Sequence, residues 1–237
     1  MRAPVKFAAI ALAIGAGAAV AQPSGAPSLG EVMVTANRTN APYAQQDRPV
    51  VGLRRTADAA VMPLVIASDT RDAEARKQEI HTALLAAMDR AAASGFEIVS
   101  GTFRVEAVTR ENYARLPLMP GGRVDTSQVR VLVKTRLAGT ATETEARLGR
   151  FIASLRGTGR ATVEFGGGLT LTVANPDQYR DAIIGLVADD AKHSAALFGP
   201  DFTINISGID GQVAWSQVSG TEVLLYIPYR YTIVPKQ

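Results

Sequence analysis

Two histidines are the obvious candidates for proton-transfer chemistry in this chain of 237 residues. His193 follows Asp189 by four residues, and a helix would place both side chains one turn apart, where the carboxylate can orient an imidazole for general-base catalysis. The polar face of a solvated helix produces the same spacing, and no nucleophile in a positioning motif accompanies the pair. We therefore interpret His193 and Asp189 as surface residues, and His81 as structural or exposed.

The remaining sequence motifs do not match those of metal-binding or cofactor-binding sites. The chain has no cysteine, which excludes thiol nucleophiles, disulfides and Cys-ligated metals, and neither histidine has a second one nearby. The run Gly166-Gly167-Gly168 lacks the Lys-Ser/Thr of a phosphate-binding loop, and Gly157-Thr158-Gly159 lacks the third glycine of a dinucleotide fingerprint. We predict no catalytic residue, no metal and no cofactor, and therefore a protein that is not an enzyme.

Cationic and aromatic side chains define candidate ligand or interface faces. Such a face can bind an anionic envelope glycan or lipid headgroup, although a solvated face or an oligomer contact has the same composition. Trp215 is the only tryptophan and lies in a glycine-bounded loop, where an exposed indole indicates an interface anchor and a buried one a core plug. The other candidates are Arg130, Lys134 and Arg136 on one predicted strand, and Tyr226, Arg230 and Thr232 on the last.

Residues 1–21 carry the three zones of a secretory signal peptide. Arg2 and Lys6 precede an apolar run that is shorter and richer in Ala and Gly than the roughly 20 strongly apolar residues of a membrane span. We predict cleavage after Ala21 and no transmembrane segment afterwards. Loss of the two cations lowers the formal net charge from +3 to +1, too little excess for nucleic-acid binding. Export without cysteines favours the periplasm, with an extracellular destination left open.

Residues 22–48 are mostly small or polar and are predicted to form a flexible tail. One β-prone hexamer interrupts it, and we consider three interpretations: a partner-docking strand, an ordinary first strand, and a chance match. The hexamer consists of Glu31, Val32, Met33, Val34, Thr35 and Ala36.

Residues 49–237 are predicted to form a single domain. Apolar side chains spaced three and four residues apart predict helices at 70–94, 142–157 and 176–198, the second beginning at a capping box of Thr142 and Glu145. Pro63 places its strand at an edge or a bulge, and the three glycines at 166–168 indicate a bulge or a tight bend. The strands are expected at residues 50–56, 60–68, 96–108, 129–137, 161–173, 202–209 and 222–234.

This pattern predicts an α+β fold. About seven strands that neighbour one another in pairs favour a mostly antiparallel sheet, with three amphipathic helices packed on one face. No repeat with a period of 20–50 residues is visible, which argues against a solenoid or propeller. The third helix is expected on the same face as the other two, and both the family resemblance and the ranking of functions depend on that position.

The order of elements from Val50 to Val234 resembles the SIMPL-domain family of exported bacterial proteins. The segments that carry the resemblance are Thr56–Ala60, which leads into the second strand, and Arg180–Gly199, which spans the third helix. The family often has proline at the position of Ala57. The resemblance implies a periplasmic α+β domain without enzyme activity or cofactor. Some relatives form ring-like homo-oligomers or are linked to envelope and oxidative stress.

The hexamer at residues 31–36 is similar to the TonB box of outer-membrane receptors. A TonB box works by donating a mobile strand to the sheet edge of a partner. The rest of the chain is too short and too helical for a receptor barrel. The similarity therefore concerns only the tail, as a possible contact with an envelope protein.

We expect an exported envelope protein of SIMPL type that acts by self-association or partner binding and has a link to envelope or oxidative stress. A homo-oligomer and an envelope partner at the N-terminal tail are the expected assemblies. The alternative is a periplasmic module that binds a small molecule, a glycan or a lipid headgroup. An enzyme ranks third.

Overall fold

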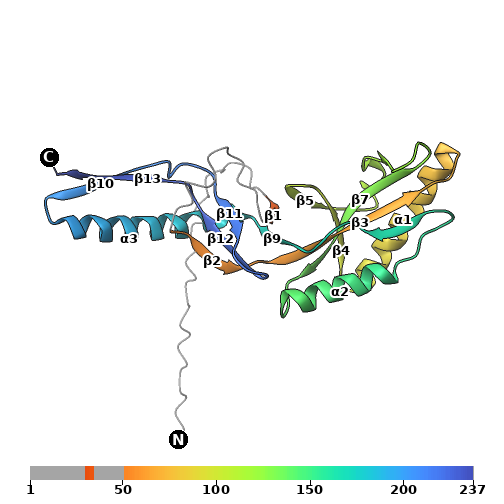
Figure 1. Ribbon diagram of the computed structural model, residues 1–237, viewed down its shortest axis with the longest axis horizontal. Helices are drawn as coiled ribbons and strands as arrows, with labels where there is room; N and C mark the ends of the chain where they lie inside the picture. The colour runs from red at the N-terminus through yellow and green to blue at the C-terminus, as the bar shows by residue number, and fades with distance from the viewer. Residues whose placement is uncertain (1–29, 35–50, 237) are drawn as a thin grey trace, which may run out of the picture.

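The computed structural model describes residues 30–34 and 51–236. The predicted signal peptide, most of the predicted tail, Thr35 and Ala36 lie outside the described residues. Figure 1 shows an elongated molecule with strands and two helices at one end and α3 with a β-hairpin at the other. We call the first part the body and the second part the arm. Within the described ranges, no helix is both long and apolar enough to cross a membrane.

Three α-helices and mostly antiparallel sheets give the α+β class that was predicted. The structure divides the chain into more strands than the seven expected, because 96–108, 161–173 and 222–234 each form two strands and short strands occur elsewhere. The body contains β1 (Glu31–Val34), β3 (Ala59–Ser68), α1 (Ala73–Ala93), β4 (Glu97–Ser100), β5 (Arg104–Ala107), η1 (Tyr113–Arg115), β6 (Met119–Pro120), β7 (Ser127–Arg136), α2 (Ala141–Ser154), β8 (Thr162–Phe165) and β9 (Thr170–Ala174). The remaining elements are β2 (Leu53–Thr56), η2 (Pro176–Tyr179), α3 (Arg180–Phe198), β10 (Phe202–Ser207), β11 (Ala214–Gln217), β12 (Glu222–Tyr226) and β13 (Arg230–Pro235).

Six strands of the body pair in a closed ring. The order is β3, β7, β4, β5, β1, β9 and back to β3, and every pairing is antiparallel. Strand β6 adds to β7, and β8 adds to β3 beside β9. Closure leaves the strand edges of the ring paired, which removes sites of unwanted strand addition.

The break between β8 and β9 lies beside Pro63. The backbone N–H of Gly166 donates to the Pro63 carbonyl over 2.9 Å, and a Cβ at position 166 would lie 2.9 Å from the Pro63 Cβ. Pro63 therefore occupies a central strand that has neighbours on both sides, rather than a sheet edge. Of the two predicted positions, a sheet edge and a bulge, the edge is therefore not observed; the neighbouring ladder is instead interrupted beside Pro63, between β8 and β9.

Helices α1 and α2 cover the ring from outside. Alternate residues of β3, including Leu64 and Ile66, join Ile80 and Leu84 of α1 in the main core, all with no exposed surface. Phe96 and Phe151 stack at 4.4 Å between ring centroids. The opposite faces of the strands point into the ring, where a second small cluster contains Met33, Val61, Val99, Val105 and Leu132.

The start of α2 differs from the prediction. The capping box consists of Thr140 and Glu143, each bonded to the other's backbone N–H, and not of Thr142 and Glu145. The sequence contains Thr-x-x-Glu at both positions. Burial selects the earlier one, because Thr144 is 1% exposed and its hydroxyl donates to the Ala138 carbonyl, which requires that it already lie within the first helical turn.

Helix α3 does not lie with α1 and α2, so the expectation of three helices on one face is wrong. It packs on the hairpin of β10 and β13, where Phe198 meets Phe202 at 6.2 Å and Ser194 meets the Tyr231 hydroxyl at 3.4 Å. An amphipathic helix needs an apolar surface, and α1 and α2 already cover the ring. The resemblance to the SIMPL-domain family thereby loses its architectural argument and rests on its sequence segments.

A three-stranded sheet of β11, β12 and β2 lies between body and arm (Figure 1). Arg55 of β2 pairs with Asp58 at 2.5 Å and lies 4.4 Å from the ring centroid of Tyr179, at the entry to α3. Asp58 in turn accepts a bond from the Ala174 N–H over 2.9 Å. These contacts tie the arm to the body near its base.

Candidate functional site

The two histidines lie on different helices, His81 on α1 and His193 on α3. His193 is exposed on α3, and Asp189 forms an ion pair with Lys192 at 3.8 Å. His81 packs edge-on against Tyr113 at 5.3 Å, and burial together with the charge of Lys77 lowers its pKa. Among the described residues, no group of three or more His, Asp and Glu side chains is placed to hold a metal ion.

The three cationic residues of β7 lie on the same face of the strand but in different surroundings. Lys134 points into the ring and pairs with Glu31, and its Nζ lies 3.3 Å from a Glu97 carboxylate oxygen. Burial alone would lower the pKa of Lys134, but the bond to Glu31 and the charges of both carboxylates outweigh it and raise that pKa. Arg130 and Arg136, which lie on either side of Lys134 along β7, are both exposed. Lys134 thus joins three strands of the ring.

Trp215 is a core plug. It is 9% exposed, its ring lies 5.3 Å from that of Phe103, and its indole N–H donates to the Met33 carbonyl over 3.0 Å. Tyr226 is buried in β12, whereas Arg230 is exposed on β13. Because the chain turns between these two strands, Tyr226 and Arg230 do not share one face.

The described part of the TonB-box-like segment is an inserted strand. β1 lies between β5 and β9, and Val32 and Val34 have no exposed surface. The Met33 N–H donates to Phe103, and the Thr172 hydroxyl donates to Glu31 over 2.6 Å. This position is the one expected of an ordinary first strand. Docking of this strand to a partner would require it to leave the ring.

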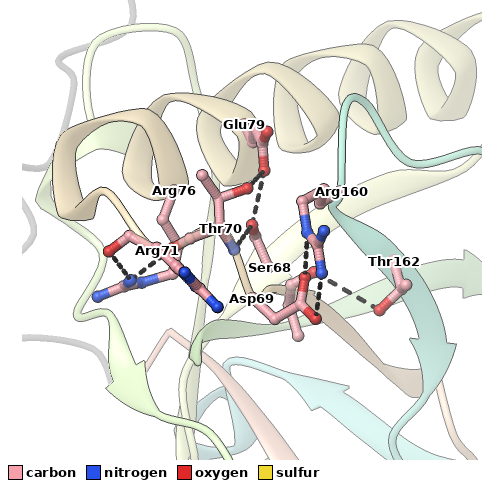
Figure 2. Close-up of polar contacts among 9 residues, drawn as sticks. Ser68, Asp69, Thr70, Arg71, Arg76, Glu79, Arg160 and Thr162 are labelled. Atoms are coloured by element: carbon pink, nitrogen blue, oxygen red, sulfur yellow. Dashed lines mark hydrogen bonds and ion pairs between the residues drawn. The ribbon is translucent and has the colours of Figure 1, made fainter. Parts of the chain in front are cut away.

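A polar cluster that the sequence did not reveal lies where β3 ends and α1 begins (Figure 2). Glu79 accepts hydrogen bonds from the Ser68 and Thr70 hydroxyls at 2.6 and 2.7 Å. Both hydrogen bonds lower the pKa of Glu79, and the bond from Ser68 has the larger effect. Asp69 is held beside them by two bonds to Arg160, at 2.7 and 2.8 Å.

This cluster fixes the turn between β3 and α1. Ser68 is 1% exposed, so a substrate in solvent does not reach its hydroxyl, which donates to the Glu79 carboxylate. Sequence alone could not find the cluster, because Arg160 is 91 residues from Asp69 and only folding brings them together.

A small pocket lies at the base of the arm, where β10 ends and β13 begins. Its volume is about 180 Å³, and its walls are Ser207, Gly208, Pro228, Tyr229 and Arg230. The Tyr229 ring lies nearly parallel to that of Tyr231, and burial, with added effects of Asp190 and Tyr231, raises the pKa of Tyr229. Arg230 is thus the one predicted ligand-face residue that lines this pocket.

The arm is the part of the described chain with the most exposed apolar surface. Five of the nine large apolar side chains that are exposed belong to α3, β10 and β13: Leu186 (40%), Leu197 (72%), Phe198 (59%), Ile206 (36%) and Tyr231 (40%). Strands β10 and β13 pair only with each other within the described residues, so each leaves one edge open. The arm is therefore the candidate functional site.

Comparison with family models, curated proteins and solved structures found no match to this chain. The function is accordingly argued from the geometry of the arm.

Proposed function

We propose that this is a non-enzymatic, exported envelope protein that acts by self-association through its arm. The observation that carries the proposal is the open two-stranded hairpin. Its two strands contain twelve residues, and Arg230 is the only one that is charged. Proteins that remain monomeric usually protect strand edges with charges, prolines or covering elements.

The charges of the arm do not oppose contact between two copies. Helix α3 and the two strands carry three cations, Arg180, Lys192 and Arg230, and three anions, Asp181, Asp189 and Asp190. Two copies would therefore meet without a net repulsion between arms. Exposed apolar side chains concentrated on one element mark interaction surfaces more often than scattered ones do.

Localisation in the periplasm, a SIMPL-type role and a link to envelope or oxidative stress belong to this proposal. They are supported by the signal-peptide pattern of residues 1–21 and by the two sequence segments, Thr56–Ala60 and Arg180–Gly199, on which the family resemblance rests. A second contact, between the N-terminal tail and an envelope protein, is part of the same proposal and would use residues 31–36, of which 31–34 would have to leave the ring.

Sedimentation of the chain from Gln22 onward over a range of concentrations tests self-association. We expect a concentration-dependent dimer or larger assembly. Ile206→Lys on the arm should shift it toward monomer, because a charge at a strand edge opposes pairing. Val124→Lys is the matched control, since Val124 is 99% exposed on the body. A monomer at every concentration contradicts the proposal.

The pocket at the base of the arm favours a second candidate, a module that binds a small anionic molecule, a glycan or a lipid headgroup. Arg230 supplies positive charge, and Tyr229 supplies a ring and a hydroxyl. Titration calorimetry with glycerol phosphate tests this candidate. Binding that Arg230→Ala abolishes would support it, and absence of heat in the native protein would contradict it.

A further inference from the structure

We infer that two copies associate by antiparallel pairing of β10 with β10 about a two-fold axis. The product is a four-stranded sheet with both α3 helices on one face. This inference rests on the proposed self-association and specifies its geometry.

The register of the hairpin shows which backbone groups face outward. Phe202 lies opposite Pro235, and one step further the Lys236 N–H donates to the Asp201 carbonyl over 2.7 Å. Bonded and non-bonded pairs alternate in an antiparallel ladder. The inward bonds therefore belong to the odd-numbered residues of β10, and the N–H and C=O groups of Ile204 and Ile206 point to its outer edge.

The same alternation of inward and outward backbone groups makes the edge of β13 less suitable than that of β10 for the addition of a strand. Its outward groups belong to Tyr231, Ile233 and Pro235, and proline has no N–H to donate. The edge of β10 contains neither a proline nor a charged residue. Strand addition is consequently favoured at β10.

Two β10 edges fit each other without adjustment. In a register centred on Ile204, residue 204 faces 204 of the second copy, and 202 faces 206. The outward donors and acceptors of each strand then meet those of the other. A two-fold contact requires a surface that complements itself, and this edge has that property.

The position of α3 on the hairpin leaves enough space for the α3 helix of the second copy on the same face of the four-stranded sheet. The helix contacts Phe202 of β10 through Phe198, and Tyr231 of β13 through Ser194, so it lies over both strands. With neighbouring strands about 4.8 Å apart, the axes of the two helices would be roughly 10 Å apart. Packed helices are typically separated by about 8–10 Å.

The two flanks of α3 carry different side chains, and the flank that would face the second α3 helix carries small ones. Ser194 and Asp190 lie toward the β13 side, as their effects on Tyr231 and Tyr229 show. Helical geometry places Ala188 and Ala195 on the other flank, toward β10, and both are half-buried. Small side chains allow close approach of two helices, and pairing would also cover part of Phe198, which is 59% exposed.

A pair of proline variants tests the choice of edge. Ile204→Pro removes an outward N–H of β10 and leaves the bonds of the hairpin intact, so the dimer dissociation constant should rise about 100-fold through the lost bonds and the steric clash. Ile233→Pro is the matched control, because residue 233 lies opposite 204 and its N–H faces the β13 edge. The inference predicts little change for this variant, and the reverse pattern overturns it.

Cysteine cross-linking tests the register in a chain that has no cysteine of its own. Thr203→Cys with Asn205→Cys places thiols on the exposed face, where 203 and 205 of the two copies form a non-bonded pair about 4.5 Å apart between Cα atoms. We expect a covalent dimer after mild oxidation. Thr232→Cys with Val234→Cys is the equivalent pair for β13 and should not cross-link.

The outcomes separate the inference from the proposal on which it rests. Association in solution without cross-linking at 203 and 205 overturns the β10 pairing and leaves self-association through the arm in place. A protein that sediments as a monomer overturns both.

Discussion

The body and the arm are both built from helices and antiparallel strands, but the strands are closed into a ring in the body and have open edges in the arm. In the body, strands are closed into a ring, and buried side chains lie on both of their faces. In the arm, one helix covers one face of a two-stranded hairpin, and only Ile183, Val187 and Ala191 of α3 are fully buried. An isolated hairpin is marginal in water, so the hairpin of the arm depends on its packing against α3.

The part of the molecule that closes its own strand edges is thus distinct from the part that we propose contacts a second copy. Inside the ring of the body, Glu31 pairs with Lys134 and accepts a hydrogen bond from Thr172. The arm keeps backbone donors and acceptors on open edges. Open edges are useful only to a partner, whereas a closed ring serves the fold.

The largest effect is expected from a cavity in the body. Leu84→Ala removes a side chain with no exposed surface and should lower the free energy of unfolding by about 3 kcal/mol, through lost burial and the cavity that remains. Urea denaturation followed by circular dichroism measures it. A loss below roughly 1 kcal/mol would mean that the body is no better packed than the arm.

A smaller effect is expected from the bond between Trp215 and β1. Trp215→Phe keeps an aromatic ring beside Phe103 and removes the donor to the Met33 carbonyl. An unpaired buried carbonyl costs about 2 kcal/mol, and chemical denaturation should show a loss of that order. Unchanged stability would show that β1 does not depend on this bond.

The turn at Glu79 should make the body sensitive to acid. Its pKa in the folded protein is lowered, so its contribution is present above the ordinary value of 4.5 and is lost as the pH falls through the folded value. Glu79→Gln should cost about 1 kcal/mol at neutral pH. The difference from the native protein should shrink below pH 4.5, as urea midpoints at several pH values will show, and a constant difference would contradict this assignment.

The smallest effect is expected at the tip of the arm. Leu197→Ala truncates a side chain that is 72% exposed, and the free energy of unfolding should change by less than about 0.5 kcal/mol. The same substitution type therefore gives very different results at Leu84 and at Leu197. Equal losses at the two positions, measured in the same denaturant series, would remove the distinction between body and arm.

Local patterns were sufficient for some features. The stripe from Ile80 to Ala91 predicted α1, and the three glycines at 166–168 predicted a bulge or a tight bend in the strand expected at 161–173, where the structure has the break between β8 and β9. The capping box of α2 was placed two residues late, because two Thr-x-x-Glu motifs compete in the sequence and the burial of Thr144 decides between them.

Features that join distant segments were not predicted. Nothing near Lys134 in the sequence indicates Glu31, which is 103 residues away, so the ion pair between these two side chains was not predicted. The bond from Trp215 to Met33 spans 182 residues. Such contacts depend on how the strands close, which hydrophobic periodicity does not encode.

Short-range patterns in the chain are enough to predict the α+β class, the three helices and most of the strands, because capping, turn residues and apolar spacing act over a few residues. The closure of the body strands into a ring and the position of α3 on a separate hairpin depend on contacts between distant segments. An amphipathic helix specifies that it needs an apolar partner, and the surfaces still uncovered after the rest has packed determine which partner it receives.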